Sequence, residues 1–484
     1  MSWGPTGGSA AFRARAGQLL RVGDDGLSAE VEAIPVGDAV ATGHARRRRD
    51  RRARTTGAVG VVVQVVNQGI RLVVIPLAIK MLGVEQYGLW LVVGSLVAWG
   101  GLTDLGLAPG LINVVARAEG RGDRQEMRRA ISTAFAAYGV LAVLVAALAF
   151  GLSRWSGLAG LLGARTPELA ASGRMLVLVC GLIFAASTLT RVVSTTTNAL
   201  QKGYLGYLSY LAGSLASLGL LFALVAVGRG GLLSYVLVVS VPPLLAQMGL
   251  AGYVFGLLHR DLRPALRWFD IASLRTLWGF AGPLTVYQMA NLGVLYSANL
   301  LIANRLGAGM VPQYSVPYAA FAVFIAAAFL IVTPYTPALA EAKARGDWQW
   351  IKKRTSHLLL VSVGMFMAGA LVLTLAGQPL IRWWTHKAVH PPMGLLVALM
   401  IFGVFRVAGN TINEVLTGLG LVRLTAGAFV GVSAFYVITA WLALPAFGLI
   451  TVPVVCGIAH MVYLAVSLPA AFRHMERGKA LVAN

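Results

Sequence analysis

The sequence predicts an all-α polytopic membrane protein with about twelve transmembrane helices in two parallel-repeat six-helix bundles. Three observations lead to this fold class. The chain is 57% hydrophobic and only 12% charged, which is about half the charge of a soluble domain. Apolar runs of about 20 residues, long enough to cross a bilayer as a helix, recur from Gly57 to Phe472. The second half of the chain also repeats the first.

The apolar runs define the predicted spans and their orientation. We place them at residues 57–80, 87–110, 130–152, 174–198, 205–227, 232–257, 277–303, 314–338, 356–376, 393–417, 424–445 and 449–471. An even number puts both termini on one side of the membrane. Of the 40 Lys and Arg residues, 26 flank the termini or the connections on that side. Because cytoplasmic loops are enriched in basic residues, both termini are expected in the cytoplasm.

These spans divide the chain into five predicted parts. They are a disordered basic cytoplasmic tail (1–54), an N-terminal bundle (55–258), a cytoplasmic linker (259–275), a C-terminal bundle (276–472) and a cytoplasmic tail (473–484). The first tail ends in RRRRDRRAR, a block that suits nucleic acid or the anchoring of the first span. Anchoring is the commoner role beside a transmembrane helix, so we expect no nucleic-acid partner. The basic and aromatic linker suits an anionic membrane surface.

An internal repeat relates the two bundles. Gly122-Asp123 recurs at Gly346-Asp347. The same offset in residue number relates the first and seventh spans, carrying Gln64, Asn67, Gly69, Leu82 and Gly83 onto Gln288, Asn291, Gly293, Leu306 and Gly307. The two bundles are therefore copies with the same orientation, related by an axis along the membrane normal. Such transporters bind their substrate between the repeats, near the midplane.

Polar side chains follow one helical face in four symmetry-related spans. Spacings of three, four and seven residues place side chains on the same side of a helix. Unpaired polar groups in hydrocarbon cost several kcal/mol each, so these faces must meet protein or water. We predict that they form the substrate cavity. The residues are Gln64, Asn67, Arg71, Arg191, Asn198, Gln288, Asn291, Arg406, Asn410 and Asn413.

The three arginines within spans suggest an anionic substrate. Arg71 lies about nine residues, or roughly 13 Å, from the outer end of its span, which is farther than its side chain reaches. Asp104 and Glu414, the clear acids within spans, leave structural pairing open for two of the arginines. A net-positive aqueous cavity that binds an anion explains all three. Glu414 and Asp104 are the candidate ion-coupling residues.

The sequence indicates neither an enzyme nor a metal protein. The outer connections are short, and no D-x-D, H-E-x-x-H or CxxC motif is present. Cys180 and Cys456 both fall within spans, where packing explains them. We therefore expect no catalytic residues, no metal and no cofactor.

Two stretches resemble a known family. They read IPLAIKMLGVEQYGLWLVVGSL (Ile75 to Leu96) and TDLGLAPGLINVVARAEGRGD (Thr103 to Asp123). Both look like the start of Wzx-type polysaccharide flippases, which belong to the multidrug/oligosaccharidyl-lipid/polysaccharide exporter superfamily. The resemblance implies a MATE-like fold that works by alternating access in the bacterial inner membrane. It also implies translocation of undecaprenyl-pyrophosphate-linked oligosaccharide, for O-antigen or exopolysaccharide, from the cytoplasmic to the periplasmic leaflet.

The resemblance also implies the partners of the protein. These are the lipid-linked substrate, membrane lipids, and the polysaccharide polymerase and chain-length machinery. Arg71, Arg191 and Arg406 are the positions that suit the basic cavity of such a flippase. A multidrug or cation antiporter of the same superfamily is the alternative. Cationic drugs require carboxylates in the membrane, and the first and seventh spans contain none.

Overall fold

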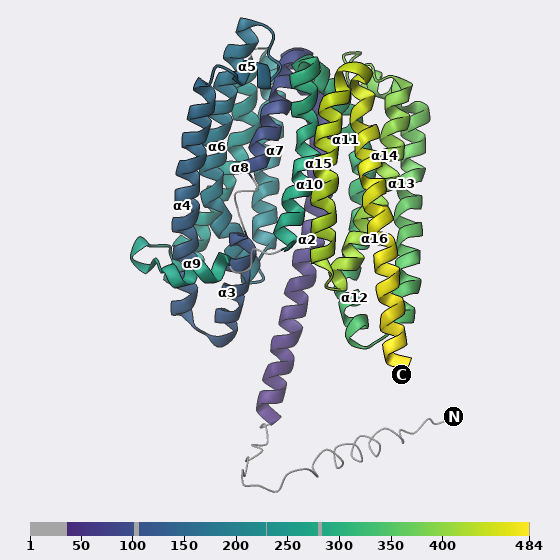
Figure 1. The fold of residues 1–484 in the computed structure, drawn as a ribbon. Coiled ribbons are helices and arrows are strands. Elements are labelled where there is room, and N and C mark those ends of the chain that lie inside the picture. The colour runs from purple at the N-terminus through teal and green to yellow at the C-terminus, as the bar shows by residue number, and fades with distance from the viewer. Residues whose placement is uncertain (1–35, 101–105, 229, 279–282, 484) are drawn as a thin grey trace, which may run out of the picture. The chain divides into compact units, whose positions relative to one another are not determined.

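The computed structural model describes residues 36–100, 106–228, 230–278 and 283–483. The chain divides into two units, residues 1–51 and 52–484, and the second contains all the helices except the first part of α2. Its first half contains α2 (Val36–Trp99), α3 (Leu107–Arg121), α4 (Arg124–Arg154), α5 (Leu158–Leu161), α6 (Pro167–Ala199), α7 (Tyr204–Val227) and α8 (Leu232–Tyr253) (Figure 1). After α9 (Ile271–Trp278), the second half contains α10 (Pro283–Leu306), α11 (Val311–Val332), α12 (Tyr335–Ala344), α13 (Trp348–Trp384), α14 (Met393–Gly418), α15 (Val422–Phe447) and α16 (Thr451–Ala483).

The described helices account for the twelve predicted spans. Among the described residues, nine segments are long and apolar enough to cross a membrane. Thr55–Trp99 is interrupted by non-helical backbone at Gly83 and supplies two spans, and Thr425–Ala480 covers most of both α15 and α16. The last span is α10, in which Gln and Asn residues lower the hydropathy. The chain is a multi-pass helical membrane protein, as the sequence predicts.

Backbone geometry repeats between the two halves. Gly83 and Gly307, which the sequence repeat aligns, both end the first span of their half with positive φ (74° and 100°). Glycine adopts this conformation without the steric penalty of a side chain. The interruption in α2 therefore has a counterpart after α10.

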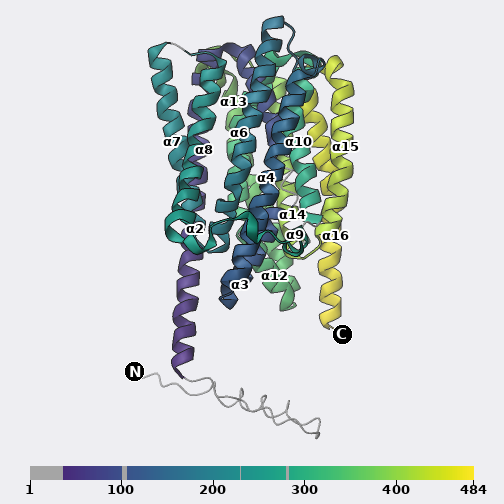
Figure 2. The same cartoon turned by 90° about the vertical axis from the view of Figure 1, so that its left-hand side faces the viewer.

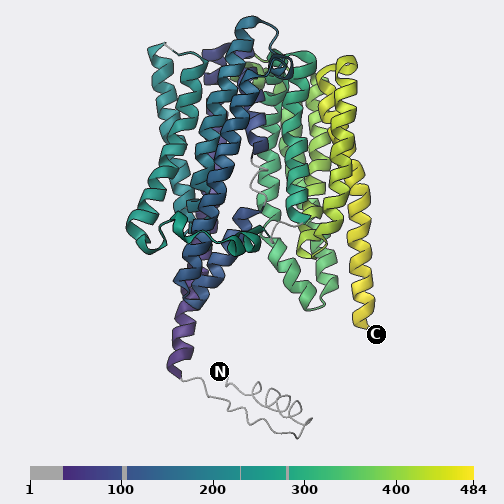
Figure 3. The ribbon, with the colours of Figure 1, turned by 60° about the vertical axis from the view of Figure 1, so that its left-hand side comes forward.

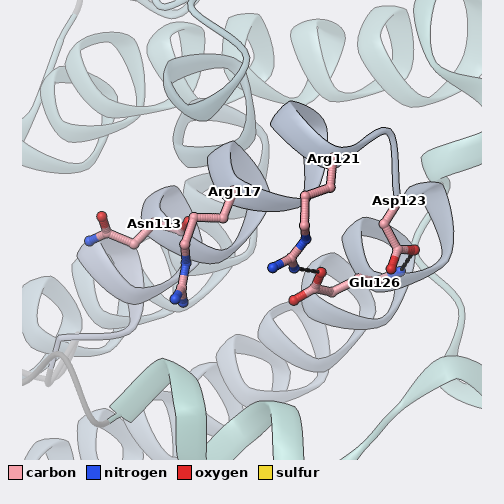
Figure 4. A network of polar contacts seen from close by, with 5 residues as sticks. All are labelled: Asn113, Arg117, Arg121, Asp123 and Glu126. Atoms are coloured by element: carbon pink, nitrogen blue, oxygen red, sulfur yellow. Dashed lines mark hydrogen bonds and ion pairs between the residues drawn. The ribbon is translucent and has the colours of Figure 1, made fainter. Parts of the chain in front are cut away.

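The loop between α3 and α4 also has a copy in the second half. Asp123 accepts a hydrogen bond from the Glu126 backbone N–H at 2.8 Å, and Figure 4 shows this carboxylate beside the Arg121–Glu126 ion pair. Asp347 accepts from the Trp350 N–H at 3.1 Å. Each aspartate caps the helix that follows it. The same cap at equivalent positions of the repeat supports the duplicated architecture.

Helix α2 starts earlier than the first predicted span. Residues 36–54, which the sequence analysis assigned to a disordered tail, belong to α2, while residues 1–35 lie outside the described part. Alanine and arginine are both strong helix formers, and residues 36–54 are rich in both. Charge composition predicted disorder here, whereas helix propensity favours the extension of the helix.

The predicted linker forms short helices. Residues Arg260–Leu262 and Leu266–Trp268 are 3₁₀ turns, and α9 follows. All three segments contact α4. In Figure 3 they lie near α3, at the end of the bundle where α16 finishes (C in the figure). We call this end the terminal end, and the end that carries α5 the far end.

The two halves share one apolar core and also have separate ones. The largest cluster of buried residues joins first-half side chains such as Leu89 to second-half side chains such as Val311. At the terminal end, Leu111 and Met127 belong to a first-half cluster, and Ile412 belongs to a second-half cluster. Apolar burial therefore joins the halves toward the far end and leaves them independent at the terminal end.

Close backbone contacts join the halves at the far end. The Ala308 N–H donates to the Gly163 carbonyl at 3.2 Å. The Asn304 side chain donates to the Gly160 carbonyl at 3.0 Å. A Cβ atom on Gly88 would lie 2.0 Å from the Ala308 oxygen, so only glycine permits this approach of the two backbones.

A proline supplies one more contact between the halves. Pro76 lies inside α2 and has no N–H to donate to the carbonyl of Leu72, four residues earlier. The Trp384 indole N–H of α13 donates to this carbonyl at 3.1 Å. A backbone acceptor freed in one half is thus satisfied by a side chain of the other half.

We predict that Trp384→Phe destabilises the protein. The substitution removes the donor to Leu72, and an unsatisfied buried carbonyl costs about 1–3 kcal/mol. The buried thiols of Cys180 and Cys456 allow unfolding to be followed with a thiol-reactive dye. The midpoint of thermal unfolding should fall.

Pro76→Ala provides the matched test, because alanine restores the helical donor to Leu72. In a double-mutant cycle, Trp384→Phe should cost clearly less when Pro76→Ala is present. Equal costs in both backgrounds would mean that the indole acts through packing alone.

Candidate functional site

A large cavity lies between the two halves. Its volume is about 1130 Å³, and its lining comes from α2, α7 and α8 of the first half and from α10, α11 and α14 of the second. Figure 2 shows α7 and α8 side by side in the first half. Nine of the predicted residues belong to the lining: Gln64, Asn67, Arg71, Gln288, Asn291, Arg406, Asn410, Asn413 and Glu414.

The cavity runs along the helices from the terminal end toward the far end. Glu414 and Thr417 line it within the last two turns of α14, close to the C-cap at Leu419. Tyr87 lines it just after Gly83, and Tyr314 lies in the first turn of α11. Because residues near both ends of the spans line it, the cavity extends along most of the length of the spans.

Arg71 presents its charge to the cavity. The residue is exposed although it lies in the middle of a span, well before the interruption at Gly83. Within the part of the chain that the structure describes, no ion pair involves Arg71. An exposed guanidinium at this depth is stable only where water or a polar ligand reaches it.

Arg406 approaches the cavity from the other half and is far more buried. Only 7% of the residue is exposed, and its guanidinium carbon lies 5.9 Å from the centre of the Phe402 ring. Tyr318 of α11 lines the same cavity as Arg406 and Arg71. The two arginines therefore line one cavity, with one from each half.

Neutral polar and aromatic groups make up much of the remaining lining. Asn299 of α10 donates to the Ser95 hydroxyl of α2 at 2.9 Å and accepts from Ser315 at 2.6 Å. This network crosses between the halves. Tyr314 and Tyr318 stack with their ring centres 5.8 Å apart. Hydroxyls, amides and aromatic faces are the groups that bind sugars and other uncharged polar ligands.

Among the described residues that line the cavity, Glu414 is the one acid. Its carboxylate accepts a hydrogen bond from the Thr336 hydroxyl of α12 at 2.6 Å. Arg406 lies eight residues, or roughly 12 Å, deeper along α14. The charged groups of the described lining are thus two guanidinium groups and one carboxylate.

Three predicted residues do not belong to this lining. Asp104 lies outside the described residues. Asn198 is exposed near the end of α6, and Arg191 is half-buried with its guanidinium carbon 5.9 Å from the Phe184 ring. Their role in substrate binding stays a prediction.

Helix length separates Arg191 from Arg406. Arg191 precedes its C-cap, Leu200, by nine residues, whereas Arg406 precedes its C-cap, Leu419, by 13. The four extra residues are about one helical turn, or roughly 6 Å. Helix α14 therefore continues about one turn farther past its arginine than α6 does, although the sequence repeat aligns the two residues.

Helices α7 and α8 also line the cavity, although none of the predicted site residues belongs to them. Tyr210, Ser214 and Ser217 line the cavity from α7, and Tyr235 lines it from α8. The spacing of four and three residues in α7 is a helical face and could have been found. Tyr235 gives no such signal, because a tyrosine in an apolar helix looks like core.

The described residues contain no group of three or more His, Cys, Asp or Glu that could hold a metal ion. The cavity is lined instead by cations, amides, hydroxyls and aromatic rings. These groups can bind an anion that carries a polar, uncharged portion.

We predict that the cavity is wet and accessible from the terminal end. Cysteines in place of Gln64 and Gln288 should react with a membrane-impermeant methanethiosulfonate at least about 10-fold faster than a cysteine at Val143. Thiols react as thiolates, which form in water and not in lipid, and Val143 is 69% exposed on a membrane helix. The native Cys180 and Cys456 are buried and give a low background. Equal rates at all three positions would contradict a wet cavity.

Comparisons with known proteins identify the fold. No protein family model matches the sequence, and no curated protein matches it. A solved structure titled as the inward-facing conformation of a multidrug resistance MATE family transporter of the MOP superfamily aligns over 88% of this chain and 95% of its own, at 14% identity and a TM-score of 0.71. An outward-facing one aligns over 89% and 96%, at 15% identity and a TM-score of 0.60.

The lipid II flippase MurJ in an inward closed conformation is also similar. It aligns over 87% of this chain and 90% of its own, at 11% identity and a TM-score of 0.60. At such identities the likeness establishes the fold, which is the MATE-like fold predicted from the sequence.

Proposed function

We propose that this protein is a flippase that moves an undecaprenyl-pyrophosphate-linked oligosaccharide across the bacterial inner membrane by alternating access. The cargo would be a repeat unit of a surface polysaccharide such as O-antigen or exopolysaccharide. The observation that carries the proposal is the pair of arginines, one from each half, that line a cavity otherwise rich in neutral polar groups.

The chemistry of this cargo matches the lining. A diphosphate cannot enter hydrocarbon unaided, and guanidinium groups bind phosphate through paired, charge-assisted hydrogen bonds. Asn67, Asn291 and Asn410 offer amides to the uncharged glycan. An enzyme reading has less support, because the MATE transporters and MurJ, which share this fold, are named as transporters and a flippase.

Alternating access follows from the two kinds of contact between the halves. In the present conformation the halves meet at the far end, as Ala308 and Gly163 show, and have separate apolar cores at the terminal end. With cytoplasmic termini, as the basic residues indicate, the cavity would receive its cargo from the cytoplasmic leaflet. Separation of the far-end contacts would release the cargo to the periplasmic leaflet, where a polysaccharide polymerase and its chain-length partners would use it.

The membrane potential favours this direction. Moving negative charge outward gains about 2.3 kcal/mol per elementary charge for each 100 mV of inside-negative potential. A diphosphate cargo could therefore move without a coupled ion. Glu414 is the described cavity residue that would bind a coupled proton or cation if one takes part.

We predict that Arg71→Ala and Arg406→Ala each reduce translocation by about 10-fold or more. A hydrogen bond to a charged group contributes about 1.5–3 kcal/mol. Arg71→Lys should retain part of the activity, because lysine keeps the charge but not the paired geometry. Surface glycan in a flippase-deletion strain, and flipping of the lipid-linked substrate in vesicles, measure the effect.

Arg382→Ala is the matched control, because Arg382 is exposed in the last turn of α13 and does not line the cavity. Arg191→Ala separates two hypotheses. The sequence repeat predicts a loss equal to that of Arg406→Ala, and the cavity lining predicts a smaller one. Normal glycan export by both Arg71→Ala and Arg406→Ala, with normal insertion, would sink the proposal.

A multidrug or cation antiporter is the second candidate. Glu414 in the cavity favours it, because a carboxylate can bind a cationic drug and a proton in turn. Expression of this protein should give no resistance to a panel of cationic dyes if the flippase proposal is right. Resistance that Glu414→Gln abolishes would favour the antiporter.

A further inference from the structure

A second hollow lies at the start of α13, away from the cavity. Its volume is about 340 Å³, and its lining residues are Trp350, Lys353, Arg354 and His357. Their spacing of three, four and seven residues puts them on one helical face. None of the four is an acid, and within the described part of the chain no ion pair involves Lys353 or Arg354. The hollow is therefore cationic.

Aromatic rings hold one of its charges in place. The Arg354 guanidinium carbon lies 5.2 Å from the centre of the Tyr335 ring and 5.5 Å from that of Trp350. Cation–π contacts of this kind orient a guanidinium and leave its N–H groups free to bind an anion. Lys353 and His357 are exposed beside it.

The same face of α13 continues as a stripe suited to lipid. Leu360, Val372 and Leu375 lie along it and are 74%, 62% and 69% exposed. In a membrane helix such side chains face acyl chains. Leu360 is three residues, or roughly 4.5 Å, beyond His357. The hollow therefore lies where the lipid-facing stripe meets the headgroup layer.

The first half covers the equivalent face with its own chain. The sequence repeat aligns His357 with Thr133 of α4, whose hydroxyl accepts from the Asp270 N–H at 3.0 Å. The neighbouring Ser132 hydroxyl accepts from the Ala265 N–H at 3.2 Å. Asp270 and Ala265 belong to the segment that joins the two halves.

This connecting segment is held firmly. Arg128 lies with its guanidinium carbon 5.0 Å from the centre of the Trp268 ring. Hydrogen bonds from Ser273 and the Ala272 N–H lower the pKa of Asp270, whose charged carboxylate caps α9. In the second half, no described segment makes equivalent hydrogen bonds to Ser356 or His357 of α13. Glu476 of α16 reaches Lys352, whereas Lys353 and His357 are exposed.

We propose that the hollow of Trp350, Lys353, Arg354 and His357 binds the phosphate headgroup of an acidic phospholipid from the leaflet at the terminal end. Arginine and lysine supply charge-assisted hydrogen bonds to the phosphate, and basic pockets beside transmembrane helices suit anionic headgroups. Trp350 and Tyr335 are typical of the membrane–water interface. The proposal does not depend on what the central cavity transports.

The test is lipid retention measured by native mass spectrometry. The protein is reconstituted in phosphatidylethanolamine that contains a minority of cardiolipin or phosphatidylglycerol. The unmodified protein should retain the acidic lipid preferentially. Lys353→Gln together with Arg354→Gln should weaken its apparent affinity on the order of 10-fold or more, because each basic residue near a membrane surface adds to the attraction.

Lys80→Gln together with Arg382→Gln is the matched control, since it removes two exposed charges outside the hollow. This pair should retain the acidic lipid normally. Thermal unfolding, followed through the buried cysteines, checks that both variants fold. Equal retention by the two variants, or no preference of the unmodified protein for acidic lipid, would overturn the proposal. Displacement of the lipid by millimolar inorganic phosphate alone would point to a site for free anions instead.

Discussion

The cost of a charge in hydrocarbon governs the design of this protein. An arginine at the depth of Arg71 is stable only with an ionic partner or with water and polar ligands. Arg71 has no ion-pair partner among the described residues and faces a cavity. Arg406 contributes a second charge from the opposite half and is shielded by Phe402. The two arginines within the membrane thus require the cavity, which also offers space for a ligand.

Duplication explains most of the architecture. Features that only one half has arise where the two copies differ. Gly83 and Gly307 end equivalent spans with positive φ, and Asp123 and Asp347 cap equivalent helices. The copies differ at the segment that connects them, which makes hydrogen bonds to Ser132 and Thr133 of the first half. They differ also in the number of residues from Arg191 to the C-cap of α6, nine, and from Arg406 to the C-cap of α14, 13. Differences of this kind give the two sides of the cavity unlike groups.

Hydropathy and the sequence repeat predicted the fold. They did not predict the surroundings of each polar residue or the residues at which the helices begin and end. The spans follow from apolar length, and the face of each polar stripe follows from helical spacing. Spacing within one span does not show which neighbouring helices a residue meets, so Arg191 and Arg406 looked equivalent although only Arg406 of the two lines the cavity. Tyr87 and Tyr318 escaped notice because aromatic residues in apolar helices give no contrast. Residues 36–54 looked like a tail because charge composition does not reveal helix propensity.

The hydrogen bond from Trp384 to the Leu72 carbonyl shows how a contact between the halves can be exchanged. Pro76 leaves this carbonyl of α2 free, and a side chain of the opposite half satisfies it in the present conformation. If the halves separate at the far end, as the proposed alternating access requires, water that enters between them can take the place of the indole. The exchange costs little, because a typical hydrogen bond contributes only about 0.5–1.5 kcal/mol net. Such hydrogen bonds, and the close approach of Gly88 to Ala308, act together with the apolar core that joins the halves at this end.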